Sequence, residues 1–157
     1  TAAKKSSLLE EASNLVSVLN KEKELKLDDL KTYRQFVDNI SKAKDDLITF
    51  IRKVKKDGKT IYGLGASTKG NVLLQYCGIT ESDLNMIGEV NPDKYDCFSP
   101  GTLLPIKSEN TVLDKKPDYL LVLPWHFRNF FENNNKFIDT KLVFPLPKLE
   151  IVGNEKF

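Results

Sequence analysis

Hydrophobic side chains recur at steps of three and four residues along residues 1–57, which is the period of a helix that packs by one face. The first such series consists of Leu8, Ala12, Leu15, Val16 and Leu19. The polar segment 21–26 predicts a turn. After it, Asp28 or Asp29 can cap a second helix, because a short carboxylate side chain accepts from the free N–H groups of a first turn.

The second helix is predicted from a longer apolar stripe and a basic end. The stripe consists of Tyr33, Val37, Ile40, Leu47, Ile51 and Val54. Four basic residues lie in positions 52–56, where the helix dipole favours cations, and Gly58 supplies the C-terminal stop. We interpret the stripe as a face packed on the following domain. A coiled-coil or dimer seam is the alternative, which the few heptads and the polar Lys44 within the stripe disfavour.

From Lys59 onward the pattern changes to short apolar runs that alternate with helical stretches. Strands are expected at 60–64, 85–90, 103–106, 119–123, 141–146 and 149–152, and helices at 69–76 and 127–137. The continuous apolar run 119–123 is typical of a strand buried on both faces. Strands that alternate with helices predict an α/β fold, a Rossmann-like parallel sheet with flanking helices preceded by a long N-terminal helical extension.

Composition places a boundary inside the chain. All eight Gly and all seven Pro lie from Gly58 onward. We therefore expect a helical extension or linker at 1–57 and a Rossmann-like C-terminal domain at 58–157.

Charge and cysteine content exclude several functions. The chain has 24 basic and 22 acidic residues, a net charge of +2, so nothing favours nucleic acid or an anionic membrane. Cys77 and Cys97 form neither a disulfide framework nor a zinc motif, and a single histidine predicts no metal site. No apolar run approaches the ~20 residues that cross a bilayer. We expect a soluble, reduced, cytoplasmic protein.

A glycine-rich loop joins the first predicted strand to the next helix. Its candidate ligand-binding residues are Gly63, Gly65, Ala66, Ser67, Thr68, Lys69 and Gly70. In this topology the helix N-terminus directs free N–H groups at the edge of the sheet, and hydroxyls and a lysine add donors, so a phosphate or pyrophosphate is the expected ligand. The alternative is that the glycines only permit a close turn between strand and helix.

Three further candidates follow later strands and are expected to face the same crevice. Glu89 ends the second strand, where a carboxylate can bind a ribose. Trp125 and His126 follow the buried strand, where Trp125 can stack on a base or sugar and His126 can hydrogen-bond a hydroxyl. A purely structural role for His126 is the alternative. We assign no catalytic residue and no metal ligand.

The glycine spacing excludes two familiar nucleotide loops. It is G-x-G-x-x-x-x-G, whereas the dinucleotide fingerprint is G-x-G-x-x-G, and no Lys-Ser/Thr follows Gly70 as in a Walker A loop. A dinucleotide-binding domain of an NAD(P)-dependent oxidoreductase therefore stays an alternative supported only by the glycines and Glu89. A non-enzymatic interaction module that assembles through the helix at 28–57 is a second alternative.

Taken together, the motifs resemble the C-terminal domain of the S-adenosylmethionine-dependent sugar C-methyltransferases. The motifs, in order, are IYGLGASTKGN at 61–71, VNPDK at 90–94, SPGT at 99–102, KPDY at 116–119, PWHF at 124–127 and FPLPKLEIV at 144–152. The resemblance extends from about residue 17 to residue 152. The aromatic pair Phe130 and Phe131 is unusual for this family and suggests a domain-contact face.

The resemblance implies a division of labour between three domains. Such enzymes have an N-terminal zinc-binding domain, a middle domain with the S-adenosylmethionine site and a Tyr-x-Glu-His element, and this C-terminal domain. Neither a cysteine cluster nor that element occurs here. The resemblance therefore implies a C-terminal fragment, or a stand-alone relative, that holds a nucleotide-diphosphate sugar, binds no cofactor itself and is inactive alone.

Overall fold

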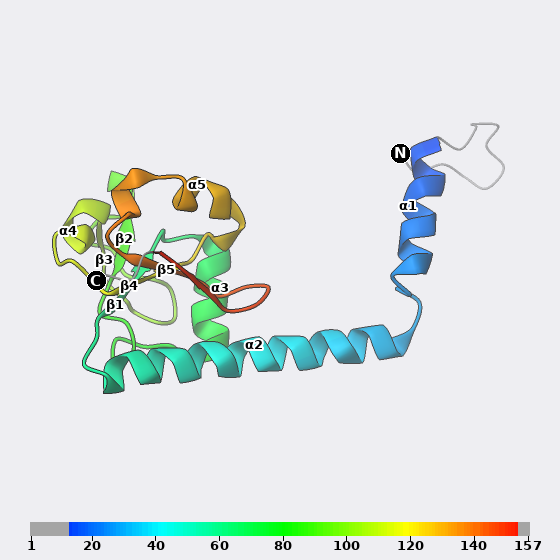
Figure 1. Cartoon of the computed structure of the whole chain (residues 1–157), viewed down its shortest axis with the longest axis horizontal. Coiled ribbons are helices and arrows are strands. Elements are labelled where there is room, and N and C mark those ends of the chain that lie inside the picture. Colours follow the sequence, from blue (N-terminus) through cyan, green and yellow to red (C-terminus); the bar gives the residue numbers. More distant parts are fainter. Residues whose placement is uncertain (1–12, 154–157) are drawn as a thin grey trace. The chain divides into compact units, whose positions relative to one another are not determined.

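The computed structural model describes residues 13–153, so the predicted apolar positions Leu8 and Ala12 lie outside the described residues. The chain divides into two compact units, Thr1–Ile40 and Ser41–Phe157. Helix α2 (Leu30–Lys56) begins in the first unit and ends in the second. The predicted long helical extension before the sheet is confirmed (Figure 1).

The first unit contains helix α1 (Ser13–Glu24), a turn and the start of α2. The turn is shorter than predicted, because α1 continues through most of the polar segment and ends only at Glu24. Asp29 is the residue that caps α2, since its carboxylate accepts from the N–H of Lys31 at 2.8 Å. The Tyr33 hydroxyl closes the turn by donating to the carbonyl of Leu27 at 2.6 Å.

The second unit is built on one six-stranded sheet of order β3-β2-β1-β4-β5-β6. The strands are β1 (Ile61–Leu64), β2 (Ile87–Glu89), β3 (Ile106–Ser108), β4 (Tyr119–Val122), β5 (Lys141–Phe144) and β6 (Glu150–Val152). All neighbours pair in parallel except β6, which runs antiparallel to β5 along the edge. The predicted α/β class and the parallel sheet are therefore confirmed.

Helices cover both faces of this sheet. The C-terminal half of α2 and helix α3 (Thr68–Cys77) pack on one face, where Ile51, Leu74 and Leu121 belong to one hydrophobic cluster. Helices α4 (Glu109–Leu113) and α5 (Arg128–Glu132) cover the other face, where Val112 and Phe131 join a second cluster (Figure 1). The central strand β4 supplies both clusters, as the continuous apolar run 119–123 predicts.

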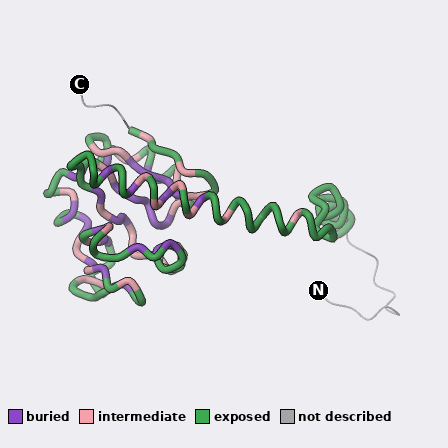
Figure 2. Tube along the Cα trace, turned by 90° about the horizontal axis from the view of Figure 1, so that it is seen from below, coloured by how far each residue is buried: buried purple, intermediate pink, exposed green. Residues whose placement is uncertain are grey.

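Burial changes along α2. Its buried side chains are Ala43, Leu47, Ile51 and Val54. The apolar side chains of its first turns are exposed instead, at Leu30, Tyr33, Phe36 and Val37. Figure 2 shows the same change along the helix. The interpretation of a face packed on the following domain is thus confirmed for residues 43–54.

Two parts of the sheet region differ from the predicted elements. Strand β3 begins at Ile106, later than expected, and helix α4 follows it directly. A five-residue helix has no apolar period to detect, and its N-cap Ser108, which accepts from the N–H of Thr111 at 3.1 Å, holds it locally. The single helix expected at 127–137 is wrong. The 3₁₀ turn η2 (Trp125–Phe127) precedes α5, and α5 ends at Glu132, where the run of asparagines begins and leads into the 3₁₀ turn η3 (Asn135–Phe137).

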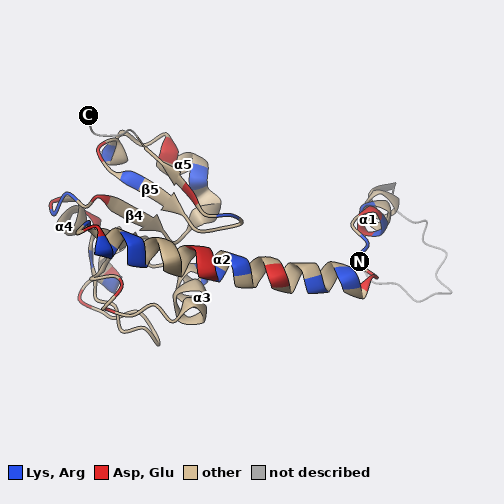
Figure 3. Cartoon of the chain, turned by 60° about the horizontal axis from the view of Figure 1, so that its bottom comes forward, with Lys and Arg blue, Asp and Glu red and all other residues tan. Residues whose placement is uncertain are grey.

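The described residues show neither a membrane-spanning helix nor a cluster of metal ligands. Basic and acidic side chains are spread along α2 (Figure 3), and among residues 13–153 no helix is long and apolar enough to cross a membrane. The same residues contain no group of three or more His, Cys, Asp or Glu side chains that could hold a metal ion.

Candidate functional site

The sheet has a switch point between β1 and β4. Strand order runs from β1 to β2 on one side and from β4 to β5 on the other, so the loops after β1 and β4 leave in opposite directions and open a crevice at the carboxyl edge. A cleft of about 270 Å³ lies there, which we call the switch-point cleft. The glycine loop contributes Gly65, Ala66 and Ser67 to it, and the segment after β4 contributes Pro124 and Phe127.

A second cleft lies on the other side of the same loop. It has a volume of about 350 Å³ and lies between α3 and the segment 93–100, and we call it the α3 cleft. Ala66, Ser67 and Lys94 border both clefts. The structure therefore places the predicted glycine loop between two clefts, with its residues at the edge of each.

The loop leaves two backbone donors without a partner at the start of α3. The Ser67 hydroxyl caps the helix by accepting from the N–H of Gly70 at 3.0 Å, and the N–H of Gly65 donates to the carbonyl of Gly88 at 2.7 Å. Among the described residues, no acceptor is found for the N–H groups of Thr68 and Lys69. Two free donors at the positive end of a ten-residue helix are what an anion needs.

The glycines of the loop also have a packing role. A β-carbon on Gly65, whose φ is +79°, would lie 2.7 Å from Pro124 Cδ, and one on Gly70 would lie 2.4 Å from Leu123 Cβ. Both contacts join the loop to the end of β4. The tight turn proposed as the alternative function of these glycines is therefore present in the structure, and it is the same turn that exposes the free N–H groups.

Replacing Gly70 with alanine is expected to lower the free energy of unfolding by about 2 kcal/mol, because the new methyl group overlaps Leu123 and the structure must shift to admit it. Urea unfolding followed by circular dichroism measures the loss. The matched control is Gly58→Ala, where no heavy atom lies within 4 Å of the added carbon and only the positive φ of +68° is strained, at a cost of about 1 kcal/mol. Equal losses in the two variants would contradict the close approach to β4.

Glu89 supports the loop from within. Only 6% of the residue is exposed, and its carboxylate accepts from the N–H groups of Ala66 at 2.9 Å, Val90 at 2.8 Å and Asn91 at 3.0 Å. Burial raises the pKa of this carboxyl, but the backbone donors and the Lys94 ammonium lower it more, so the pKa lies below its ordinary value. The ribose contact predicted for Glu89 stays a prediction, and it would require a ribose hydroxyl to replace one of these internal donors.

Lys94 is a cation that the sequence reasoning did not select. Its Nζ donates to the carbonyl of Ala66 at 3.0 Å and lies 3.3 Å from Glu89 Oε2, while 43% of its side chain stays exposed. It therefore fixes the loop and presents positive charge to both clefts. The predicted cation, Lys69, is exposed and lines neither cleft. The sequence signal that could have indicated Lys94 is its position five residues after Glu89, which ends the second predicted strand.

Trp125 and His126 lie beside the switch-point cleft without lining it. The turn η2 holds both, with Trp125 half-buried against the second core cluster and His126 exposed, its ring centroid 4.3 Å from that of Phe127. The cleft wall is formed instead by Pro124, Phe127 and Phe130. Stacking and hydrogen bonding by Trp125 and His126 therefore stay predictions.

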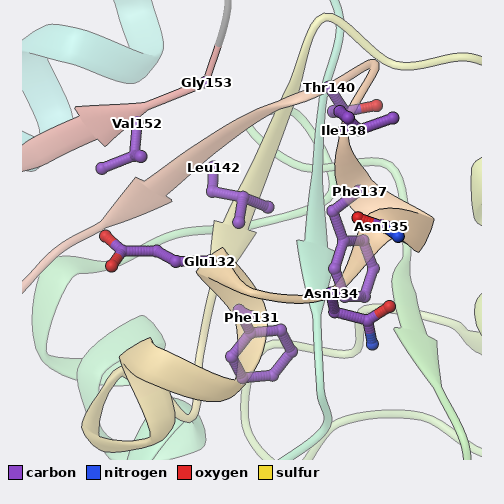
Figure 4. A pocket seen from close by; sticks show the side chains of 10 residues that line it. All are labelled: Phe131, Glu132, Asn134, Asn135, Phe137, Ile138, Thr140, Leu142, Val152 and Gly153. Atoms are coloured by element: carbon purple, nitrogen blue, oxygen red, sulfur yellow. The ribbon is translucent and has the colours of Figure 1, made fainter.

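The aromatic pair after Arg128 divides between core and surface. Phe131 is buried in the second cluster, whereas Phe130 is 63% exposed at the rim of the switch-point cleft. A further pocket of about 280 Å³ lies beneath α5 and η3, and Figure 4 shows Phe131, Phe137 and Leu142 among the side chains that line it. None of the predicted site residues lines this pocket.

The fold and the site define the class of the protein. It is a Rossmann-like α/β domain with a ligand crevice at the switch point of its sheet and free helix N–H groups beside it. A family model described as the C-methyltransferase C-terminal domain matches residues 1–147, and the chain belongs to that family.

A named relative agrees with this assignment. The C-methyltransferase NovU of Streptomyces niveus is 29% identical over 126 residues, which cover 78% of this chain and 30% of that enzyme. The chain thus spans less than a third of the length of the relative that it matches. The resemblance inferred from the order of the motifs is confirmed.

Proposed function

We propose that this domain positions a nucleotide-diphosphate sugar, a keto deoxysugar, for C-methylation by an S-adenosylmethionine-binding domain. The observation that carries the proposal is the pair of free N–H groups on Thr68 and Lys69 at the start of α3, next to Ala66 and Ser67, which border both clefts. A pyrophosphate on these donors could extend its two ends into the two clefts. Membership of the C-methyltransferase C-terminal family supports the reaction class.

The residues present do not fit S-adenosylmethionine in the usual place for an adenosyl ribose. A ribose there needs a carboxylate with free oxygens at the end of β2. The Glu89 carboxylate at that position is buried and accepts from three backbone N–H groups and from Lys94. The same argument disfavours the NAD(P)-dependent oxidoreductase. We therefore place S-adenosylmethionine, which supplies the methyl group, outside this chain, and we expect the chain to be inactive alone.

The contribution of this domain to the reaction is binding and positioning. Methylation at carbon beside a keto group would require a base elsewhere to remove a proton, so that the resulting enolate could take the methyl group from the sulfonium, whose carbon–sulfur bond breaks to release a neutral thioether. Helix N–H groups that hold the pyrophosphate would fix the sugar relative to that base, and such positioning accounts for a large part of a rate enhancement. No described residue is assigned the role of the base.

Replacing Thr68 with proline is expected to weaken nucleoside diphosphate binding about tenfold. Proline at the first position of a helix removes one N–H and leaves the helix intact, and Ser67 already has the extended conformation that a following proline requires, with φ −95° and ψ 152°. Isothermal titration with uridine and deoxythymidine diphosphates measures the effect. Thr68→Ala is the matched control, because it removes the hydroxyl and keeps the N–H.

Three outcomes separate the proposals. Weaker binding in Thr68→Pro with little change in Thr68→Ala supports a pyrophosphate on the backbone donors. Equal binding by the wild type and Thr68→Pro would contradict it. Tight binding of NADH, seen by fluorescence, together with silence toward nucleoside diphosphates would favour the oxidoreductase instead.

A further inference from the structure

The switch-point cleft has a size that suits one ring of a ligand. Its volume of about 270 Å³ lies just below the range of roughly 300–1,000 Å³ that is usual for pockets that hold drug-sized ligands. A whole nucleotide-diphosphate sugar is larger than such a ligand ring, because it joins a base, a ribose, two phosphates and a sugar. The cleft can therefore hold one end of the ligand of the proposed function, and its lining indicates which end.

Two exposed aromatic rings form part of the wall of this cleft. Phe127 and Phe130 both line it, and each is more than half exposed. Neighbouring rings hold them in place, since the ring of Phe130 meets that of the buried Phe131 edge to face at 5.2 Å and that of Phe127 contacts His126. Rings that are already ordered offer an apolar surface at little entropic cost. A pyranose has C–H bonds on its ring faces, so such a wall can cover one of them.

A largely buried carboxylate reaches the same cleft from the start of α4. Glu109 lines the cleft, and its Oε1 lies 2.5 Å from the Nζ of Lys136, which belongs to η3. Its Oε2 has no hydrogen-bond donor among residues 13–153, yet it is not among the fully buried atoms that lack a partner. Solvent therefore reaches this oxygen, through the 11% of the side chain that stays exposed. A hydroxyl of a ligand in the cleft can donate to it.

An amide in the same lining adds a donor. Asn134 lies between α5 and η3, and its Oδ1 accepts from the N–H of Lys136 at 3.1 Å. This bond fixes the side chain, while no acceptor is found for its Nδ2 in the described part of the chain. Lys136 thus holds two polar side chains of the cleft, Glu109 through its ammonium and Asn134 through its backbone. A carboxylate oxygen and an amide NH₂ provide an acceptor and a donor, the two partners that sugar hydroxyls need.

From this arrangement we propose that the switch-point cleft holds the sugar ring of the nucleotide-diphosphate sugar. Glu109 Oε2 accepts from a sugar hydroxyl, Asn134 Nδ2 donates to a neighbouring sugar oxygen, and Phe127 and Phe130 cover an apolar face of the ring. The proposal rests on the proposed function, because it assigns one end of the same ligand. It makes Glu109 a residue that determines specificity for the sugar, although Glu109 lies outside all the sequence motifs that define the family resemblance.

The first test isolates the contribution of the sugar to binding. Isothermal titration of the chain with deoxythymidine diphosphate and with deoxythymidine diphosphate 6-deoxyglucose gives the ratio of the two dissociation constants, which we call the sugar ratio. The wild type is expected to bind the sugar nucleotide more tightly, and Glu109→Leu is expected to reduce the sugar ratio about tenfold, because a hydrogen bond to a charged group is lost. Glu150→Leu is the matched control, since this carboxylate is also in an ion pair but does not line the cleft. An equal sugar ratio in the wild type and Glu109→Leu would overturn the proposal.

A second test uses an exposed side chain, whose loss leaves the core in place. Proton NMR measures the transfer of magnetic saturation from the protein to deoxythymidine diphosphate 6-deoxyglucose. In Phe130→Ala the transfer to the sugar protons is expected to fall several-fold, while the transfer to the base protons stays unchanged. Ile138→Ala is the matched control, because Ile138 is as exposed as Phe130 but lines the pocket beneath α5 and not this cleft. If the base protons lose the transfer instead, the cleft holds the base and the proposal is overturned.

The two proposals fail in different ways. If Thr68→Pro weakens both probes by the same factor, while Glu109→Leu leaves the sugar ratio unchanged, the phosphate site stands and the sugar site is overturned. If Glu109→Leu reduces the sugar ratio while Thr68→Pro binds both probes like the wild type, the sugar site stands and the pyrophosphate lies elsewhere. If the chain binds neither probe, both proposals are overturned together.

Discussion

Replacing Ile51 with aspartate is expected to lower the free energy of unfolding by about 4 kcal/mol, a large fraction of the roughly 5–15 kcal/mol that stabilises an ordinary domain. Ile51 is 1% exposed on α2 and packs in the cluster between this helix and the sheet. A carboxylate at this position would lose its hydration inside a cluster of hydrophobic side chains, which offer it no hydrogen bond. Thermal and urea unfolding measure the loss.

Val37→Asp is the matched control for this helix. Val37 lies on the same apolar stripe two heptads earlier and is 58% exposed, so its replacement is expected to change the free energy of unfolding by less than about 0.5 kcal/mol. A large loss of stability in Val37→Asp would instead support assembly through α2, if sedimentation also shows that the wild type is a dimer and the variant a monomer. That result would revive the interaction module as an alternative function.

The difference between these two positions shows what the sequence could predict about the helix. The period of the stripe predicts the helix and its apolar face, because both depend on residues close together in the chain. Which part of the face is covered depends on the sheet, which forms from strands far along the sequence. Leu47 and Tyr33 therefore look alike in the pattern, although one is fully buried and the other half exposed.

The same reasoning applies to the candidate site. The glycine spacing after β1 could locate the loop, since a strand, a tight turn and a helix follow one another in the sequence. The partners of the loop could not be predicted, because Lys94 and Pro124 reach it only through the order of the strands. Side-chain direction is a further limit, since adjacent residues in a 3₁₀ turn diverge, and Phe127 lines the cleft where Trp125 was expected.

Replacing Glu89 with glutamine is expected to destabilise the domain by about 2 kcal/mol at pH 7. The single oxygen of the glutamine amide can still accept from the N–H groups of Val90 and Asn91. The NH₂ group that replaces the other oxygen faces two donors, the N–H of Ala66 and the Lys94 ammonium, so a buried hydrogen bond becomes a clash between donors. Binding of a nucleoside diphosphate should weaken as well, because the same bonds hold the glycine loop.

The pH dependence of unfolding distinguishes this role from simple packing. Because the pKa of Glu89 is lowered in the folded protein, its contribution to stability is complete above its ordinary value of 4.5 and is lost as the pH falls through the lower folded pKa. The wild type should therefore lose stability on acidification from about pH 4.5, and Glu89→Gln should lose less over the same range. Glu150→Gln is the control, since this carboxylate pairs with Arg128 at an exposed site where such a pair contributes less than about 1 kcal/mol. Parallel acid curves for the wild type and Glu89→Gln would mean that the buried carboxylate does not hold the loop by its charge.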